Sequence, residues 1–141
     1  MKQIENKIAT IFGNHDSLAP LLIRLLIGFH LLYAVHGVLF SSKAMAGVAG
    51  FFKSQNIPFS SFTAPLTAWA EAICACLFIL GLFTRTAAFI MVIIFICAIT
   101  IVHLGKPYPA AFPALVMLVG SLFLLLNGPG KYSIDNFISH K

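Results

Sequence analysis

The stretch from Thr63 to Leu82 limits most strongly how this chain can fold. It holds twenty residues, nearly all apolar, with one carboxylate, Glu71, near its middle. As a helix rising about 1.5 Å per residue, it would cross a hydrocarbon core about 30 Å thick. A carboxylate at that depth costs about 2.5 kcal/mol or more unless it is paired, protonated or turned towards a cavity. The stretch therefore predicts a membrane-spanning helix whose acidic residue faces the interior of a helix bundle.

The two faces of this helix favour that orientation. Small residues share an arc with Glu71, while large apolar residues occupy the opposite arc. The small set is Ala64, Thr67, Ala68, Cys74 and Ala75, and the large set is Leu66, Trp69, Ile73, Leu77 and Leu80. Small residues let helices pack closely in lipid, and large apolar residues contact acyl chains. Two interpretations of Glu71 stay open: a neutral carboxyl that hydrogen-bonds between helices, or a proton, ion or substrate site.

The remaining apolar stretches indicate the fold class. The chain has 141 residues, of which 60% are hydrophobic and 9% charged, whereas soluble domains average about 25% charged residues. Spans are predicted at about 20–40, 63–82, 86–103 and 110–127, within a single domain covering residues 1–141. The prediction is an all-α membrane protein, a four-transmembrane-helix antiparallel bundle in contact with the lipid bilayer.

Two segments outside the spans also show helical patterns. In residues 1–17, apolar side chains recur at i, i+4, i+7 and i+8, which predicts an amphipathic N-terminal segment lying on the membrane surface. These side chains are Ile4, Ile8, Ile11 and Phe12. The connection 41–62 is rich in phenylalanine and ends in a turn at Asn56 and Pro58. It fits an interfacial helix or a partly re-entrant loop better than a free soluble loop.

Charge and cysteine content exclude some functions and predict a topology. Basic residues are scattered between the spans, so no nucleic-acid partner is expected. Three cysteines inside spans, Cys74, Cys76 and Cys97, suggest buried inert thiols and not a disulfide framework. With four spans, one side carries Lys2, Lys7, Arg24, Arg85, Lys131 and Lys141, and the other carries Lys43, Lys53 and Lys106. The positive-inside rule then places both termini in the cytoplasm.

Polar residues in the other spans suggest a site around Glu71. His30, Tyr33 and His36 share one arc of the first span, and Arg24 lies on the opposite side, close enough to the helix end to snorkel to the headgroups. Thr100 and His103 share an arc of the third span with Cys97. The predicted orientation puts His30 level with Glu71, and Tyr33, His36, Thr100 and His103 nearer the outer face. The set predicts an outward-opening polar cavity. No metal site is predicted, because His36 and His103 lack a nearby third ligand.

Seven sequence segments in order resemble the DoxX family of small four-helix membrane proteins. They are LLIRLLIGF, VHG, AGFFKSQNIP, AEA, LGLFTRTAA, ITIVHLGK and GPGKYSIDN, and together they run from about Leu22 to Asn136. The last segment is the most specific of the seven. The positions that match polar or glycine positions of the family are Arg24, His36, Gly37, Glu71, Gly81, Arg85, His103, Gly128, Pro129, Gly130, Ser133 and Asp135.

The resemblance implies a bacterial inner-membrane protein linked to redox chemistry. Some members of the family are associated with thiosulfate:quinone oxidoreductase activity, and others are thought to tether redox enzymes at the membrane. This chain departs from many relatives in two places. Val38 to Phe40 stand where a lysine is common, and Ala110 to Ala114 stand where a glutamate is common.

Three functions are consistent with the sequence. The first is a redox-associated membrane subunit, quinone- or thiol/sulfur-linked, with a polar site at Glu71, a quinone as cofactor and a redox-enzyme partner. The second is a non-catalytic scaffold or assembly partner. The third is a small-molecule or proton-coupled carrier. Whether the protein is an enzyme stays open, and its small packing residues allow a homodimer.

Overall fold

The computed structural model describes residues 18–139, so the amphipathic segment predicted for residues 1–17 lies outside the described residues. Four helices are long and apolar enough to cross a membrane, which confirms the predicted all-α membrane bundle. They are α2 (Leu18–Leu39), α4 (Ser60–Leu80), α5 (Thr84–Cys97) continued by the π-helix η1 (Ala98–His103), and α6 (Tyr108–Asn127). Two shorter helices complete the described chain, α3 (Ser42–Ser54) and α7 (Ile134–Ser139).

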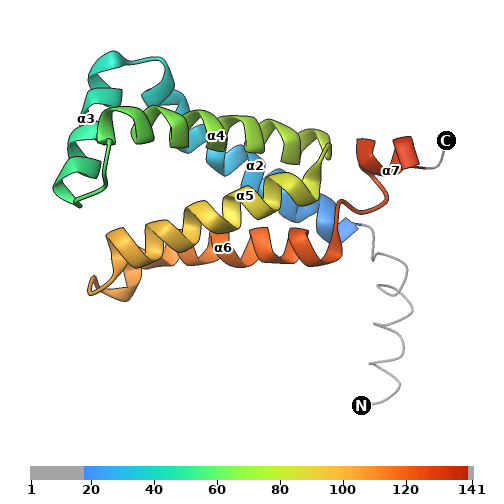
Figure 1. Ribbon diagram of the computed structural model, residues 1–141. Helices are drawn as coiled ribbons and strands as arrows, with labels where there is room; N and C mark the ends of the chain where they lie inside the picture. Colours follow the sequence, from blue (N-terminus) through green and yellow to red (C-terminus); the bar gives the residue numbers. More distant parts are fainter. Residues whose placement is uncertain (1–17, 140–141) are drawn as a thin grey trace, which may run out of the picture.

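The four long helices run antiparallel in sequence order and form a closed bundle (Figure 1). α2 packs mainly on α4 and α5 mainly on α6, while contacts between α4 and α5 and between α2 and α6 join the two pairs. α3 lies across one end of the bundle, and α7 lies at the opposite end (Figure 1). The described chain therefore starts and finishes at the same end.

The inward face of α4 is the small-residue face predicted from its sequence. Ala64, Ala68 and Cys74 are buried, whereas Leu66, Trp69 and Ile73 are more than half exposed on the outer surface. Because lipid tails are as apolar as leucine, close packing and not water exclusion holds such helices together. Gly28 shows how close the approach is, since a Cβ there would lie 2.7 Å from the Ile79 side chain and 3.0 Å from the Ala75 carbonyl oxygen.

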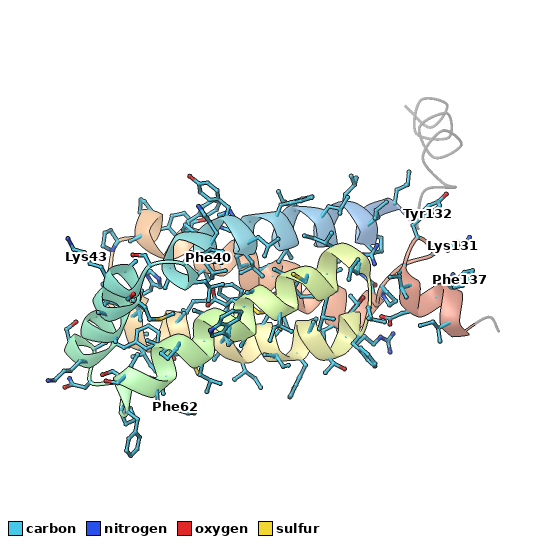
Figure 2. The ribbon with its side chains drawn as sticks, turned by 90° about the horizontal axis from the view of Figure 1, so that it is seen from above. Phe40, Lys43, Phe62, Lys131, Tyr132 and Phe137 are labelled. Atoms are coloured by element: carbon cyan, nitrogen blue, oxygen red, sulfur yellow. The ribbon has the colours of Figure 1, made fainter. Side chains whose placement is uncertain are left out.

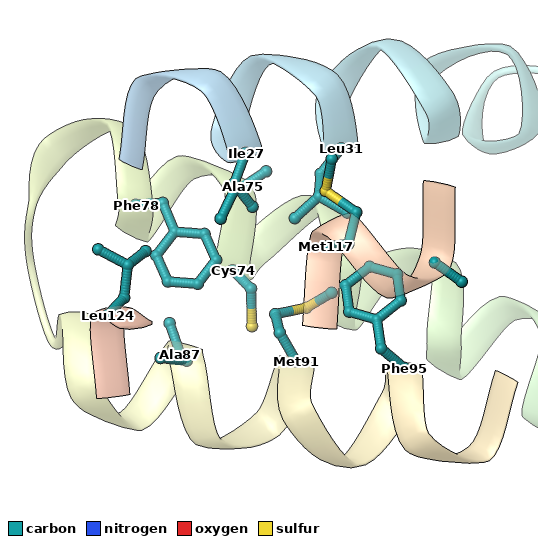
Figure 3. Close-up of a cluster of buried hydrophobic side chains, with 12 residues drawn as sticks. Ile27, Leu31, Cys74, Ala75, Phe78, Ala87, Met91, Phe95, Met117 and Leu124 are labelled. Atoms are coloured by element: carbon teal, nitrogen blue, oxygen red, sulfur yellow. The ribbon is translucent and has the colours of Figure 1, made fainter. Parts of the chain in front are cut away.

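The packed core fills the half of the bundle nearer α7. Phe78, Met91 and Leu124, from three different helices, have no exposed surface and pack together with alanines (Figure 3). Phe95 and Met117 close the cluster on the side nearer α3 (Figure 3).

The connection between α2 and α4 is a helix lying on the bundle and not a re-entrant loop. Ser41 caps α3, its Oγ accepting a hydrogen bond from the Ala44 N–H at 3.3 Å, and no residue of α3 is buried. Aromatic and basic side chains stand at both ends of the bundle (Figure 2), and side chains of these kinds are common at membrane–water interfaces. The labelled examples are Phe40, Lys43 and Phe62 at one end and Lys131, Tyr132 and Phe137 at the other (Figure 2).

The inward face of α2 corrects the sequence interpretation. Arg24 does not snorkel to the surface: it is 1% exposed and lies on the buried face with Ile27 and Leu31. Its Nη2 donates to the Tyr132 carbonyl oxygen at 2.5 Å. A buried guanidinium is stable only with such partners, and this one comes from the far end of the chain.

The cysteines also differ from the prediction. Cys74 is buried in the core, as expected. Cys76 and Cys97 are instead exposed, and neither belongs to the packed core.

Candidate functional site

A cavity of ≈ 460 Å³ lies between α4 and the continuous α5–η1 helix, in the half of the bundle nearer α3. Glu71 and His103 both line it, on opposite walls. Its remaining lining residues are mostly apolar: Phe51, Phe52, Ile57, Thr63, Thr67, Ile93, Ile94, Cys97, Ala98, Ile101 and Val102. The volume falls within the range of about 300–1,000 Å³ that is typical of small-molecule sites.

The α4 wall carries a single free polar group. Thr63, Thr67 and Glu71 recur every fourth residue and so lie along one stripe of the helix. The Thr67 hydroxyl donates to the Thr63 carbonyl oxygen at 2.8 Å, and the Thr63 hydroxyl donates to the Phe59 carbonyl oxygen at 3.2 Å. Both hydroxyl protons are thus used within α4. Among the described residues, the Glu71 carboxyl has no hydrogen-bond partner, so it is available to a bound molecule.

The opposite wall is shaped by the π-helix η1. The Thr100 hydroxyl donates to the Ile96 carbonyl oxygen at 2.8 Å and also lies 3.3 Å from the Cys97 carbonyl oxygen, which occupies backbone acceptors just where the helix widens. π-Helical turns occur frequently at functional sites. His103 ends this segment, and its Nδ1 is buried without a hydrogen-bond partner within residues 18–139. A buried unpaired imidazole nitrogen is costly, so it points to a missing partner.

The end of α3 covers the cavity. Phe51 and Phe52 stand on its last turn and line the cavity together with Ile57, which follows in the turn to α4. The Lys106 ammonium, in the loop after η1, lies 5.7 Å from the centre of the Phe51 ring. This cation–π contact joins α3 to the loop that follows His103.

The lining sets what the cavity can do chemically. Apolar walls favour a lipophilic molecule, and two polar groups can orient one end of it. A carboxyl can accept or donate a proton according to its state, and an imidazole can donate or accept a hydrogen bond. The part of the chain that the structure describes has no cluster of three or more potential metal ligands.

Four of the residues predicted for the site lie elsewhere. His30, Tyr33 and His36 are exposed on the outer face of α2, and Thr100 is exposed on η1. The interior column proposed from the sequence therefore does not form. The reason is that Arg24, on the opposite side of α2, takes the inward face of that helix.

Sequence reasoning missed several cavity residues. Phe51 and Phe52 lie in the connection, whose packing no periodicity reveals. The sequence predicts an inert buried thiol at Cys97, whereas this residue lines the cavity. Thr63 was detectable, because it continues the four-residue spacing of Thr67 and Glu71.

The glycine-rich terminal segment builds a second polar cluster at the opposite end of the bundle. Asp135 accepts two backbone hydrogen bonds at the start of α5, from the Phe83 N–H at 2.7 Å and the Thr84 N–H at 2.9 Å. The Asp135 N–H donates to the Gly81 carbonyl oxygen at 3.0 Å. The Asp135 carboxylate is also near enough to attract the Arg24 guanidinium. This segment closes the end of the bundle.

The other motif residues support the same closure. The Ser133 hydroxyl donates to the Gly130 carbonyl oxygen at 2.7 Å and accepts from the Asn136 N–H at 3.1 Å, with Pro129 just before this turn. The Arg85 guanidinium lies beside Gly128. Gly37 stands apart from them, on the exposed face of α2 with open space beside it.

Comparisons with known proteins agree with this architecture. A family model described as DoxX matches residues 19–104. The chain is also similar to the uncharacterized membrane protein Rv3486 of Mycobacterium tuberculosis, with 34% identity over 106 residues. That alignment covers 65% of this chain and 65% of the relative, so the chain spans about two thirds of the relative's length. No solved structure matches the chain.

Proposed function

The chain belongs to the DoxX family of integral membrane proteins, and from that premise we propose that it is a redox-linked membrane subunit whose cavity beside Glu71 binds a lipid-soluble quinone. One observation carries the proposal. A mostly apolar cavity of ≈ 460 Å³ holds two polar groups, the Glu71 carboxyl and His103 Nδ1, that have no hydrogen-bond partner among the described residues.

The lining fits the chemistry of a quinone headgroup. A quinone is a flat apolar ring with carbonyl oxygens on opposite edges, and when bound it supplies two-electron, two-proton redox capacity. The phenyl rings of Phe51 and Phe52 provide aromatic surface for such a ring. The His103 Nδ1 would donate a hydrogen bond to one carbonyl oxygen, and the Glu71 carboxyl would exchange a proton at the headgroup. A partner enzyme supplies or removes the electrons.

Substitution of the two polar groups tests quinone binding. In nanodiscs, Glu71→Leu and His103→Phe are each expected to weaken binding of a short-chain azido-quinone about tenfold, because each removes one hydrogen-bonding group that would hold the headgroup. Photolabelling followed by mass spectrometry measures the binding and maps the labelled peptides. Label is expected on α4 and η1.

Two control variants sharpen the result. His30→Phe changes a histidine that is level with Glu71 in the membrane but lies on the outer face of α2. This variant should leave labelling unchanged. Cys97→Ser keeps the cavity shape, so unchanged labelling with this variant separates a quinone-linked site from a thiol-linked one. Equal labelling of Glu71→Leu, His103→Phe and the unaltered protein would overturn the proposed function.

We also propose that both termini face the cytoplasm of a bacterial inner membrane. With the buried Arg24 left out, the basic residues of the sequence on that side are Lys2, Lys7, Arg85, Lys131 and Lys141, against Lys43, Lys53 and Lys106 on the other. Five basic residues against three still favour placing both termini in the cytoplasm.

Reporter fusions check this topology. Alkaline phosphatase fused after Lys141 should be inactive and green fluorescent protein at the same site should fluoresce, because only the cytoplasm supports that pair of readouts. A fusion inserted between Lys106 and Pro107 serves as the control and should give the opposite pair. Active phosphatase at Lys141 would reverse the orientation.

A further inference from the structure

The outer face of α2 carries polar side chains where a membrane helix should present apolar ones. His30 and Tyr33 stand near the middle of this 22-residue span, and Tyr33 is 77% exposed. Within residues 18–139, neither the His30 ring nor the Tyr33 hydroxyl has a hydrogen-bond partner. Unpaired polar groups facing hydrocarbon are costly, and such residues normally face a bundle interior. We therefore expect another protein surface to pack on this face of α2.

The spacing of the exposed residues indicates what kind of element packs on this face. The α2 seam, defined as Leu26, His30, Tyr33, Gly37 and Phe40, alternates steps of four and three residues, and every member is exposed. This alternation is the a/d spacing with which two helices pack along a shared left-handed seam. Gly37 has nothing within 4 Å of a Cβ built on it, so another backbone can approach closely there. The seam fits one helix running along α2.

We propose that this helix is α2 of a second copy of the chain, so that the protein forms a two-fold symmetric homodimer across the α2 seam. Copies inserted with the same orientation pair their α2 helices in parallel, which places His30 opposite His30 and Tyr33 opposite Tyr33. A neutral imidazole carries one donor and one acceptor, and a phenol is both. The two copies of His30 can therefore hydrogen-bond to each other, and so can the two copies of Tyr33. Two lysines could not, because both only donate, and two aspartates could not, because both only accept.

The side chain of His36 lies next to Tyr33. His36 Nδ1 lies 2.6 Å from the Tyr33 carbonyl oxygen, and the centres of the two rings are 5.6 Å apart. Since a carbonyl only accepts, the Nδ1–H donates and Nε2 is left as an acceptor. The His36 ring, which keeps this acceptor, therefore lies beside the Tyr33 ring next to the seam. The surface is separate from the Glu71 cavity, so the dimer does not depend on the proposed function.

Cysteine cross-linking in membranes tests the seam. In a Cys76→Ser, Cys97→Ser background, Leu26→Cys and Phe40→Cys should each give a cross-linked dimer with a short thiol cross-linker. Val119→Cys on α6 is the matched control: Val119 and Leu26 are both 64% exposed, yet Val119 is off the seam, so no dimer should form. Cross-links only at Val119, at all three sites equally, or only to a different membrane protein would overturn the proposal.

Dimer affinity in liposomes gives a second readout. Tyr33→Phe and His30→Leu keep an exposed side chain of similar size, so they should fold normally while each weakens dimerisation about threefold to tenfold. Single-molecule photobleaching over a dilution series measures the dimer fraction. Val119→Leu should change nothing. A monomer at all densities, or affinity unaffected by both seam variants, would contradict pairing through these groups.

Discussion

Replacement of Gly81 by alanine is expected to lower the free energy of unfolding by about 2–5 kcal/mol, the sum of a left-handed backbone cost and overpacking. Gly81 ends α4 with φ of 68°, a conformation that side chains with a Cβ rarely adopt. A Cβ there would also overlap the Arg24 guanidinium and lie 2.8 Å from the Ser133 Cβ. Arg24 would have to move away from the Tyr132 carbonyl that partners it.

Unfolding in mixed detergent micelles, followed by circular dichroism, measures the effect. Gly47→Ala is the matched control, because Gly47 is inside α3 and has open space beside it. That substitution should be neutral or slightly stabilising, since alanine favours helix more than glycine does. Equal unfolding curves for the two variants would show that the Gly81 turn is not tightly held.

Replacement of Asp135 by alanine is expected to lower the free energy of unfolding by about 2–4 kcal/mol, because two charge-assisted backbone hydrogen bonds are lost. The Phe83 and Thr84 N–H groups would lose their acceptor at the start of α5, where Phe83 has φ of 47° and no other cap. The buried Arg24 charge would lose the carboxylate that attracts it.

Hydrogen exchange locates this effect. Amides in the first turn of α5 should exchange faster in Asp135→Ala, while amides around the Glu71 cavity should change little. Ser139→Ala is the control, because the Ser139 hydroxyl bonds only to carbonyl oxygens of its own short helix, α7. If α5 stays equally protected in Asp135→Ala, the terminal segment does not cap it.

The sequence predicted α4 well because two independent signals agree there. Its small and large residues separate onto opposite faces, and Glu71 lies on the small face. The structure buries that face and turns Glu71 towards a cavity that also contains His103.

The orientation of α2 could not be predicted in the same way. Apolar residues surround this helix on all sides, so periodicity does not identify its inner face. Polarity suggested the histidine arc, but the inner face holds Arg24. The carbonyl that partners Arg24 belongs to Tyr132, 108 residues away in the sequence. No local pattern contains that information.

The cavity walls were only partly predictable for a related reason. η1 arises from a change in backbone hydrogen bonding, and the Thr100 hydroxyl is its one local sign. Phe51 and Phe52 reach the cavity because α3 folds back over the end of the bundle, which is a tertiary event.

The position of Asp135 near the end of the chain has a consequence for biosynthesis. Arg24 belongs to α2, which is translated before the other described helices, yet its carbonyl partner and the Asp135 carboxylate that attracts it are translated after all four long helices. During insertion the arginine must therefore stay in contact with water or headgroups, as long basic side chains near helix ends do. The bundle acquires its final packing only when the segment that carries Tyr132 and Asp135 docks. Nascent chains halted before Tyr132 should accordingly be the ones that quality-control proteases remove.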